Sequence, residues 1–149
     1  MDKVLLVLLS LGIIGSPTLV FGAGSVTGSW ASHGSVESGG LWLKTIQIGK
    51  KVQFQLEISR GAPSYNSGFI EGKFNLHSGQ GIFKLKSNQD ESSDCEINFS
   101  FSPSKVVITE STETDMHQSC GFGYNVHAYG TLFIKSREKP KFSQGDPRN

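Results

Sequence analysis

A cysteine, a histidine, three glycines and three aromatic residues are packed into SCGFGYNVHAYG, residues 119–130. A thiol beside an imidazole could form a nucleophilic pair, or the two could ligate a metal. Cys120 and Cys95 are the two cysteines of the chain. Metal sites usually need three or four ligands at tight spacing, so we expect a Cys95–Cys120 disulfide. A metal pair, and a reactive thiol with His117 or His127, are the alternatives.

The N-terminus indicates the compartment in which such a bridge would form. Lys3 precedes the apolar run VLLVLLSLGII, and small residues suited to cleavage follow, with Val20 and Gly22 at the two positions that a signal peptidase reads. The apolar run is shorter than the roughly 20 residues that span a bilayer. We therefore expect residues 1–22 to be a secretory signal peptide rather than a membrane anchor, and the protein to be secreted or periplasmic. Paired cysteines in that setting are typical of a disulfide.

The composition limits the classes of partner. The chain of 149 residues carries 14 Lys and Arg against 13 Asp and Glu, without a block of like charge. A nucleic-acid binder would show a basic stripe, so we expect no nucleic-acid partner. No later segment is apolar enough for stable membrane insertion. Residues 136–149, with two prolines and little to bury, are expected to be a flexible tail.

Apolar and polar residues alternate with a period of two along much of the chain, as in VQFQLEI, residues 52–58. This pattern is typical of half-buried β-strands. We expect strands near residues 27–33, 41–49, 51–60, 68–77, 80–87, 95–102, 105–111 and 125–135. An open sheet of eight strands would leave two long edges. The sequence therefore predicts one all-β domain over residues 23–135, an antiparallel meander closed as a small barrel or flattened sandwich.

Two details of this pattern bear on the interior. The apolar face slips between Leu43 and Ile46, which predicts a β-bulge in that strand. Five phenylalanines fall on the inward face, at positions 54, 74, 83, 99 and 101. An eight-stranded barrel can be filled by its side chains or can hold one small ligand. Five inward rings favour a filled interior.

The residues left over for binding are aromatic or polar and lie in connections or on outward faces. We expect the binding candidates to be Ser38, Trp42, Tyr65, Tyr124 and His127. Exposed aromatic residues are enriched in binding surfaces. Within residues 119–130 the glycines permit sharp backbone turns, so we expect this stretch to be a corner held by the disulfide. If it has a function, we expect it to be a rim that shapes a binding face.

Gly28-Ser29-Trp30, just inside the expected mature start, resembles the Gly-x-Trp motif of the lipocalins and other calycins. That resemblance implies an eight-stranded up-and-down barrel whose tryptophan plugs the closed end and whose interior carries a small apolar ligand. The two other signature regions of the family do not occur here. The alternative is a tryptophan that belongs to the core at the start of a strand.

Ser38-Gly39-Gly40-Leu41-Trp42 resembles the Ser-Gly-x-x-Tyr motif of bacterial periplasmic lysozyme inhibitors, with tryptophan in place of tyrosine. Those proteins are also small, secreted β-folds. The resemblance implies a protein that presents a loop to the lysozyme cleft, so the partner would be a secreted protein such as a lysozyme.

Catalytic patterns are sparse. The Gly-x-Ser-x-Gly nucleophile elbow does not occur, and the histidines are isolated in the sequence. Glu113, Asp115 and His117 could hold a metal, but such loops are usually only solvated. We expect a non-catalytic binding protein without metal or cofactor, of the lysozyme-inhibitor kind. The alternatives are a calycin-like carrier and an enzyme of unrecognised type.

Overall fold

The computed structural model describes residues 24–35, 37–85, 95–112, 120 and 122–143. They form eight strands and no helix. The strands are β1 (Gly28–Ala31), β2 (Gly40–Ile48), β3 (Lys51–Ser59), β4 (Ser67–His77), β5 (Gln80–Leu85), β6 (Cys95–Phe101), β7 (Lys105–Thr112) and β8 (Gly130–Ser136). The expected signal peptide lies outside the described residues, so it stays a prediction.

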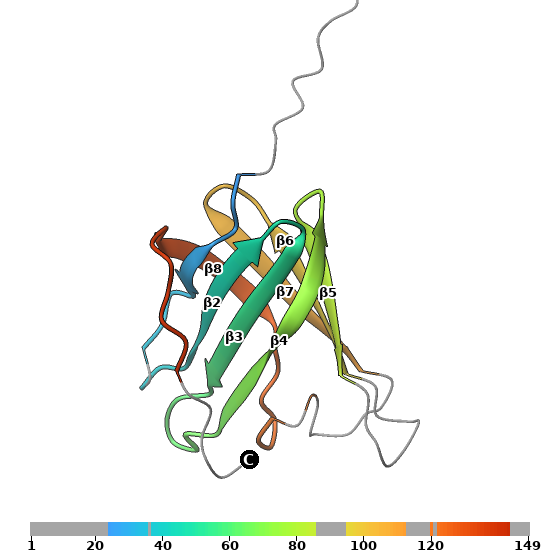
Figure 1. The fold of residues 1–149 in the computed structure, drawn as a ribbon. Coiled ribbons are helices and arrows are strands. Elements are labelled where there is room, and N and C mark those ends of the chain that lie inside the picture. Colours follow the sequence, from blue (N-terminus) through green and yellow to red (C-terminus); the bar gives the residue numbers. More distant parts are fainter. Residues whose placement is uncertain (1–23, 36, 86–94, 113–119, 121, 144–149) are drawn as a thin grey trace, which may run out of the picture.

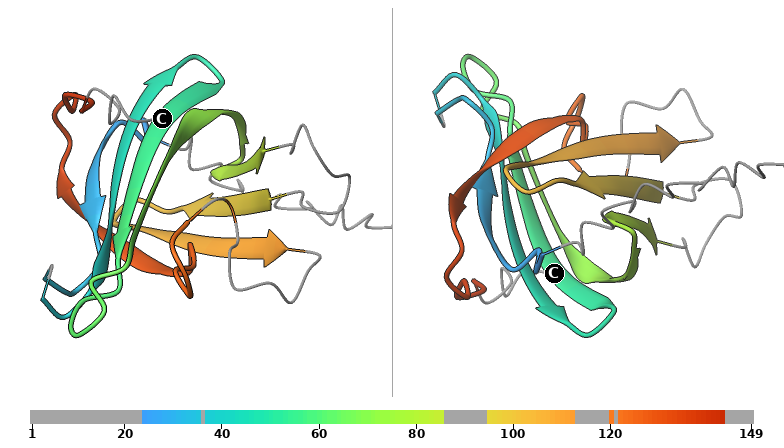
Figure 2. Two further views of the ribbon diagram at one scale, coloured as in Figure 1. Left: turned by 90° about the horizontal axis from the view of Figure 1, so that it is seen from below. Right: turned by 90° about the horizontal axis from the view of Figure 1, so that it is seen from above.

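Each strand pairs antiparallel with the next, and β1 also pairs with β8, so the sheet is a closed barrel. The end-on views of Figure 2 show the strands around a common interior. The need to remove free sheet edges is the physical reason for expecting closure, although β4 and β5 pair only at Leu76–Gly81 and His77–Gln80. The all-β, eight-stranded meander and the Cys95–Cys120 disulfide are confirmed, with the barrel rather than the flattened sandwich.

The two ends of the barrel differ. Short turns follow β2, β4 and β6 at one end, which we call the turn end and which is uppermost in Figure 1. Strands β1, β3, β5 and β7 end at the other end of the barrel, the loop end, where the longer connections after β1 and β3 and residues 122–129 before β8 lie. In an up-and-down barrel, every second connection lies at the same end, so the connections after β1 and β3 and residues 122–129 are neighbours.

Aromatic rings fill the middle of the barrel. The ring of Phe54, which is fully buried, lies 5.7, 5.1 and 5.0 Å from the rings of Phe74, Phe83 and Phe99, measured between centroids. Two glycines on the inner face make room for these rings. A Cβ at Gly72 would lie 2.3 Å from the Phe83 ring, and one at Gly81 would lie 2.2 Å from the Phe74 ring.

The bulge predicted in the second strand is absent. β2 pairs with β3 in one unbroken register from Gly40 to Ile48. The inward position at the slip is occupied by Thr45, which is fully buried and accepts a hydrogen bond from Trp30 Nε1 at 3.0 Å. Its hydroxyl also donates to the Val26 carbonyl. Because these bonds satisfy the hydroxyl, a polar residue continues the inner face and the strand needs no bulge.

Trp30 and Arg137 close the turn end. Trp30 is buried, and the Arg137 guanidinium lies 5.2 Å from the centre of its ring. Arg137 also donates to the carbonyls of Ser25 and Pro103, so it joins the N-terminal approach to the turn between β6 and β7. We expected a tail from residue 136, but Ser136 still pairs with Ser29 as the last residue of β8.

Candidate functional site

The connection between β3 and β4 is an ordered loop that presents Tyr65. Arg60 N donates to Asn66 O at 2.9 Å and Tyr65 N donates to Gly61 O at 2.8 Å, so the loop is closed by its own backbone. Tyr65 has φ of 49° and is 56% exposed. A bulky residue in the left-handed region is uncommon, because its Cβ crowds the backbone. The loop therefore holds an exposed aromatic ring on a strained backbone.

The segment after the disulfide packs against that loop. Phe122 is buried over Gly68, where an added Cβ would lie 2.4 Å from the phenyl ring. Gly123 N donates to Ser67 O at 3.3 Å, and Asn66 Nδ2 donates to Tyr124 O at 3.0 Å. Tyr124 is 57% exposed. The expected corner is therefore also part of the loop end, and its tyrosine belongs to a segment in contact with the Tyr65 loop.

The connection between β1 and β2 joins the same group. Ala62 N donates to Glu37 O at 2.8 Å, which ties this connection to the β3–β4 loop. Ser38 is exposed, and its hydroxyl accepts a hydrogen bond from Ser35 N at 2.8 Å. We call Ser38, Tyr65 and Tyr124 the loop rim. The structure brings these three predicted residues to one end of the barrel on three hydrogen-bonded segments.

The two other predicted residues lie beside the rim. Trp42 is half-buried on the outer face of β2, and a Cβ at Gly40 would lie 3.2 Å from its ring. His127 is exposed on the segment that leads into β8, which begins at Gly130 and not near residue 125. The loop containing Glu113, Asp115 and His117 lies outside the described residues.

Sequence reasoning missed the carboxylate of Glu110. This residue lies on β7, and its Oε2 accepts a hydrogen bond from Ala128 N at 2.6 Å, which holds the last connection against β7. Its Oε1 is buried and has no hydrogen-bond partner among the described residues. The signal was available in the sequence, since Glu110 continues the inward alternation of Val106 and Ile108.

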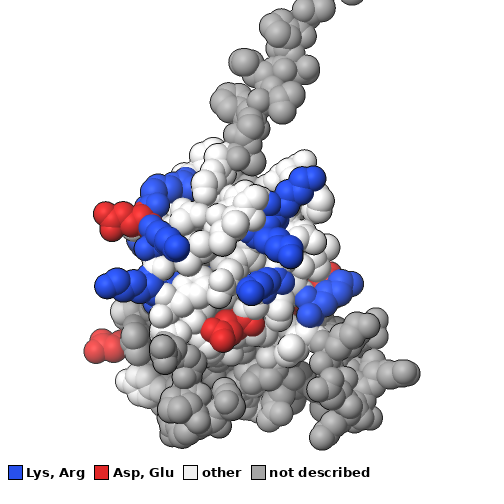
Figure 3. All heavy atoms as spheres, viewed as in Figure 1, with Lys and Arg blue, Asp and Glu red and all other residues white. Residues whose placement is uncertain are grey.

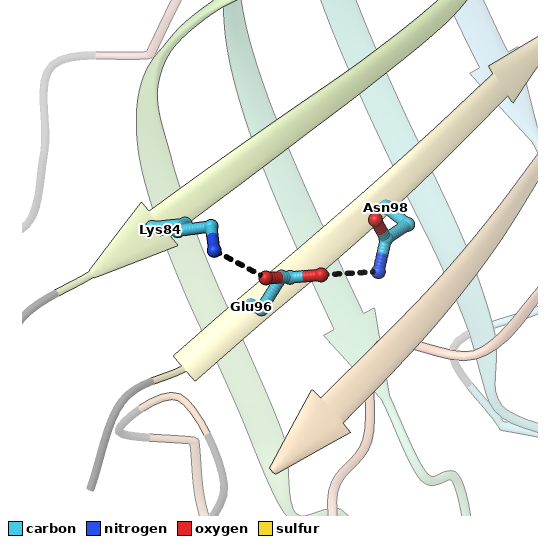
Figure 4. A network of polar contacts seen from close by, with 3 residues as sticks. All are labelled: Lys84, Glu96 and Asn98. Carbon is cyan, nitrogen blue, oxygen red and sulfur yellow. Dashed lines mark hydrogen bonds and ion pairs between the residues drawn. The ribbon is translucent and has the colours of Figure 1, made fainter.

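The outer face of β5, β6 and β7 is shallowly hollowed. A depression of about 220 Å³ is lined by Gln80, Gly81, Ile82, Asn98, Phe99, Ser100, Val107 and Thr109. Beside Asn98, Glu96 receives hydrogen bonds from Lys84 Nζ at 2.8 Å and from Asn98 Nδ2 at 3.2 Å (Figure 4). These two hydrogen bonds hold the pKa of Glu96 below its ordinary value. The bond from Lys84 is the largest cause and the bond from Asn98 is the next.

Replacing Lys84 by glutamine is expected to raise the pKa of Glu96, because the cation that favours its charged form is removed. In the parent protein, the pKa of Glu96 is lower in the folded state than in the unfolded state. The pair therefore stabilises the fold above the ordinary glutamate pKa and loses this effect as pH falls through the folded-state pKa. An NMR titration of the Glu96 carboxyl carbon measures the change. Lys73→Gln, on the outer face of β4, is the matched control, and a Glu96 pKa equal in parent and Lys84→Gln would contradict the expectation.

The described residues contain no group of three or more His, Cys, Asp or Glu side chains that could hold a metal. Cys95 and Cys120 are joined to each other, which overturns the metal pair and the reactive thiol as alternatives. Disulfides are formed by proteins of oxidising compartments. In the part of the chain described, no helix is long and apolar enough to cross a membrane.

Fold and rim together define a small, closed, eight-stranded β-barrel with a disulfide and an aromatic loop end. No family model matches the chain, and no curated protein or solved structure is significantly similar to it.

Proposed function

We propose that the chain is a secreted or periplasmic, non-catalytic binding protein that contacts a partner protein through the loop rim. The observation that carries the proposal is the joining of three loops by hydrogen bonds beneath two exposed tyrosines, Tyr65 and Tyr124. Tyrosine is suited to such contacts because it supplies a large surface and has few rotatable bonds. A rim that is already ordered also loses little conformational entropy on binding.

The backbone of Tyr65 supports the same proposal. Left-handed geometry costs a residue with a Cβ about 1–2 kcal/mol, and glycine would avoid that cost. Backbone strain of this kind clusters at binding sites and active sites. A tyrosine kept at φ of 49°, with its ring largely in solvent, gains little from packing within its own barrel.

Charge favours a basic partner. The two connections that lead from β5 to β6 and from β7 towards Cys120 lie outside the described residues, but their sequences are acidic. They carry Asp90, Glu91, Asp94, Glu113 and Asp115 against Lys86. Acidic segments complement a cationic surface and speed its encounter. Lysozyme is the first partner to test, because Ser38 of the motif that resembles the periplasmic inhibitors lies on the rim.

The alternative of a calycin-like carrier has less support. The buried Trp30 at the turn end fits the Gly-x-Trp resemblance, but a carrier needs an interior cavity. Phenylalanine rings occupy the middle of this barrel, and two depressions lined by described residues lie on its outer wall.

The test is biolayer interferometry of the oxidised protein against a panel of lysozymes, with native mass spectrometry for stoichiometry. We expect a one-to-one complex that weakens with added salt. Tyr124→Ala and Tyr65→Gly are each expected to weaken it about 30-fold, the effect of an interface hot spot of about 2 kcal/mol. Tyr65→Gly also removes the backbone strain, so its stability should stay within about 1 kcal/mol of the parent.

The control is Ile48→Ala at the turn end, where a side chain that is 75% exposed is shortened far from the rim. Its affinity should equal that of the parent. A complex that forms but tolerates both tyrosine substitutions would refute the rim as the contact surface. Absence of binding to every lysozyme would remove the inhibitor proposal.

A further inference from the structure

A buried carboxamide on the outer wall of the barrel binds the main chain of the C-terminal segment. Gln55 belongs to the outward face of β3, yet it is only 4% exposed. Its Oε1 accepts a hydrogen bond from Ser143 N at 2.9 Å, and its Nε2 donates to Ser143 O at 2.7 Å. The same Nε2 donates to Glu71 Oε2 at 2.7 Å, which orients the amide.

These contacts recognise a peptide backbone rather than a sequence. One carboxamide satisfies both the N–H and the C=O of a single residue, as a neighbouring strand would. Lys44 Nζ adds a hydrogen bond to the carbonyl of Lys141 at 3.0 Å. Among these hydrogen bonds, the one that depends on a side chain of the bound segment is donated by the Ser143 hydroxyl to Gln55 Oε1 at 3.2 Å, and Phe142 beside it is half-buried. Main-chain bonds of this type give affinity to an added peptide, and side-chain pockets give it specificity.

A small side-chain pocket adjoins these backbone contacts. Trp42, Glu57 and Phe69 lie directly opposite one another on β2, β3 and β4, and with Lys44, Gln55 and Ser143 they line a cavity of about 30 Å³. Figure 3 shows this side of the barrel, with basic side chains spaced around it and acidic ones at its left edge and lower middle. A carboxylate between two aromatic residues favours a cationic side chain, through ion pairing and attraction to the rings.

We propose that this outer face, which we call the Gln55 face (Trp42, Lys44, Gln55, Glu57, Phe69 and Glu71), is a binding site for a peptide segment of a partner protein. Gln55 and Lys44 hold the partner's backbone, and a basic side chain beside it enters the pocket at Glu57. Residues 141–143 of the chain itself occupy the site until the partner replaces them. This site is separate from the loop rim and does not depend on the function proposed for it.

The reason for expecting exchange is the small number of hydrogen bonds that hold the segment. Among the described residues, four hydrogen bonds join residues 141–143 to the barrel, and each contributes only about 1 kcal/mol. Covalent linkage to β8 through Ser136 gives the segment an effective concentration in the millimolar range. A partner peptide must therefore compete with it, and weakening the internal segment should expose the site.

The experiment uses the full chain and a synthetic probe, a peptide with the sequence of residues 139–143 followed by one lysine. Ser143→Pro removes the backbone N–H that donates a hydrogen bond to Gln55 Oε1, and it leaves every residue of the barrel unchanged. Ser143→Ala, the matched control, keeps that N–H and removes the hydroxyl alone. The readout is the NMR signal of the Trp42 indole. The Trp30 indole, buried and bonded to Thr45, reports that the barrel is folded.

The peptide is expected to shift the Trp42 signal saturably in Ser143→Pro, with at least tenfold higher affinity than in the parent or in Ser143→Ala. Adding Gln55→Glu to Ser143→Pro should weaken binding at least tenfold, because a carboxylate cannot donate to the peptide carbonyl. Gln53→Glu makes the same charge change two residues earlier on β3. Added to Ser143→Pro, it should leave the affinity for the peptide unchanged. A probe ending in glutamate should bind several-fold more weakly.

Three results would overturn the proposal. The first is no saturable shift of Trp42 in Ser143→Pro. The second is equal affinity for the parent and Ser143→Pro. The third is binding that is insensitive to Gln55→Glu while the Trp30 signal shows a folded barrel.

Discussion

The Phe54→Ala variant is expected to lose about 3–5 kcal/mol of unfolding free energy, the usual cost of removing a buried phenyl ring. The Phe54 side chain is fully buried and touches the rings of Phe74, Phe83 and Phe99. Collapse into the space left behind is limited, because β3, which carries Phe54, is paired along its whole length with both β2 and β4. The cost should therefore include an empty cavity in addition to the lost burial.

Urea unfolding followed by circular dichroism measures this loss. Phe69→Ala is the matched control, since it deletes the same ring from the outer face of β4, where the side chain is 39% exposed. Its loss should stay below about 1.5 kcal/mol, because a part-exposed ring gives up less apolar area. Equal losses for the two variants would show that the interior is not packed around Phe54.

The same variant separates a filled barrel from a carrier. A dry apolar cavity of this origin can bind a small apolar ligand such as benzene. Phe54→Ala is therefore expected to gain affinity for benzene, seen as an upward shift of its melting temperature with ligand. The parent should show no such shift. Stabilisation of the parent by the same concentration of benzene would favour the carrier alternative.

The sequence was sufficient to predict the strands and their closure. A strand with one buried face has a period of two, so VQFQLEI at residues 52–58 could form little else. The inward phenylalanines followed from the same alternation, and closure followed from the need to remove sheet edges. The structure confirms each of these, because they depend on local pattern and on one general rule.

What the sequence did not reveal depends on partners distant in the chain. Thr45 is polar but buried, because its bonds to Trp30 and Val26 satisfy its hydroxyl. Gln55 is a polar residue on an outward face, but it is covered by Ser143, 88 residues later. No hydropathy pattern distinguishes such residues from solvated ones, so the bulge at Thr45 was predicted wrongly and the contact between Gln55 and Ser143 was not foreseen.

The rim was predictable only in part. Tyr65 and Tyr124 are aromatic residues in Gly- and Ser-rich connections, which was enough to nominate each one. Their proximity depends on the bond from Asn66 to the Tyr124 carbonyl, a contact between residues 58 apart. The disulfide expected between Cys95 and Cys120 limited the position of the second loop, but not which neighbour it would meet.

Removing the disulfide by the double substitution Cys95→Ala and Cys120→Ala is expected to cost about 3–4 kcal/mol of unfolding free energy. The bridge closes a sequence separation of 25 residues, which restricts the unfolded chain. The measurement is the urea midpoint of parent and variant, each with and without reductant. Reductant should lower the midpoint of the parent to that of the variant and leave the variant unchanged. A parent midpoint that resists full reduction of the bridge would contradict the expectation.

The bridge should matter for stability more than for the shape of the rim. Phe122 is buried over Gly68 through its own packing. Gly123 N donates a hydrogen bond to Ser67 O and Tyr124 O accepts one from Asn66 Nδ2, so neither contact involves the disulfide. Below its unfolding transition, the double variant should therefore bind the partner proposed for the rim within about threefold of the parent, because the proposed contacts do not include the disulfide. Amide exchange at Gly123 and Val126 would rise in step with global unfolding. Faster exchange confined to those two amides would instead show that the disulfide positions the rim directly.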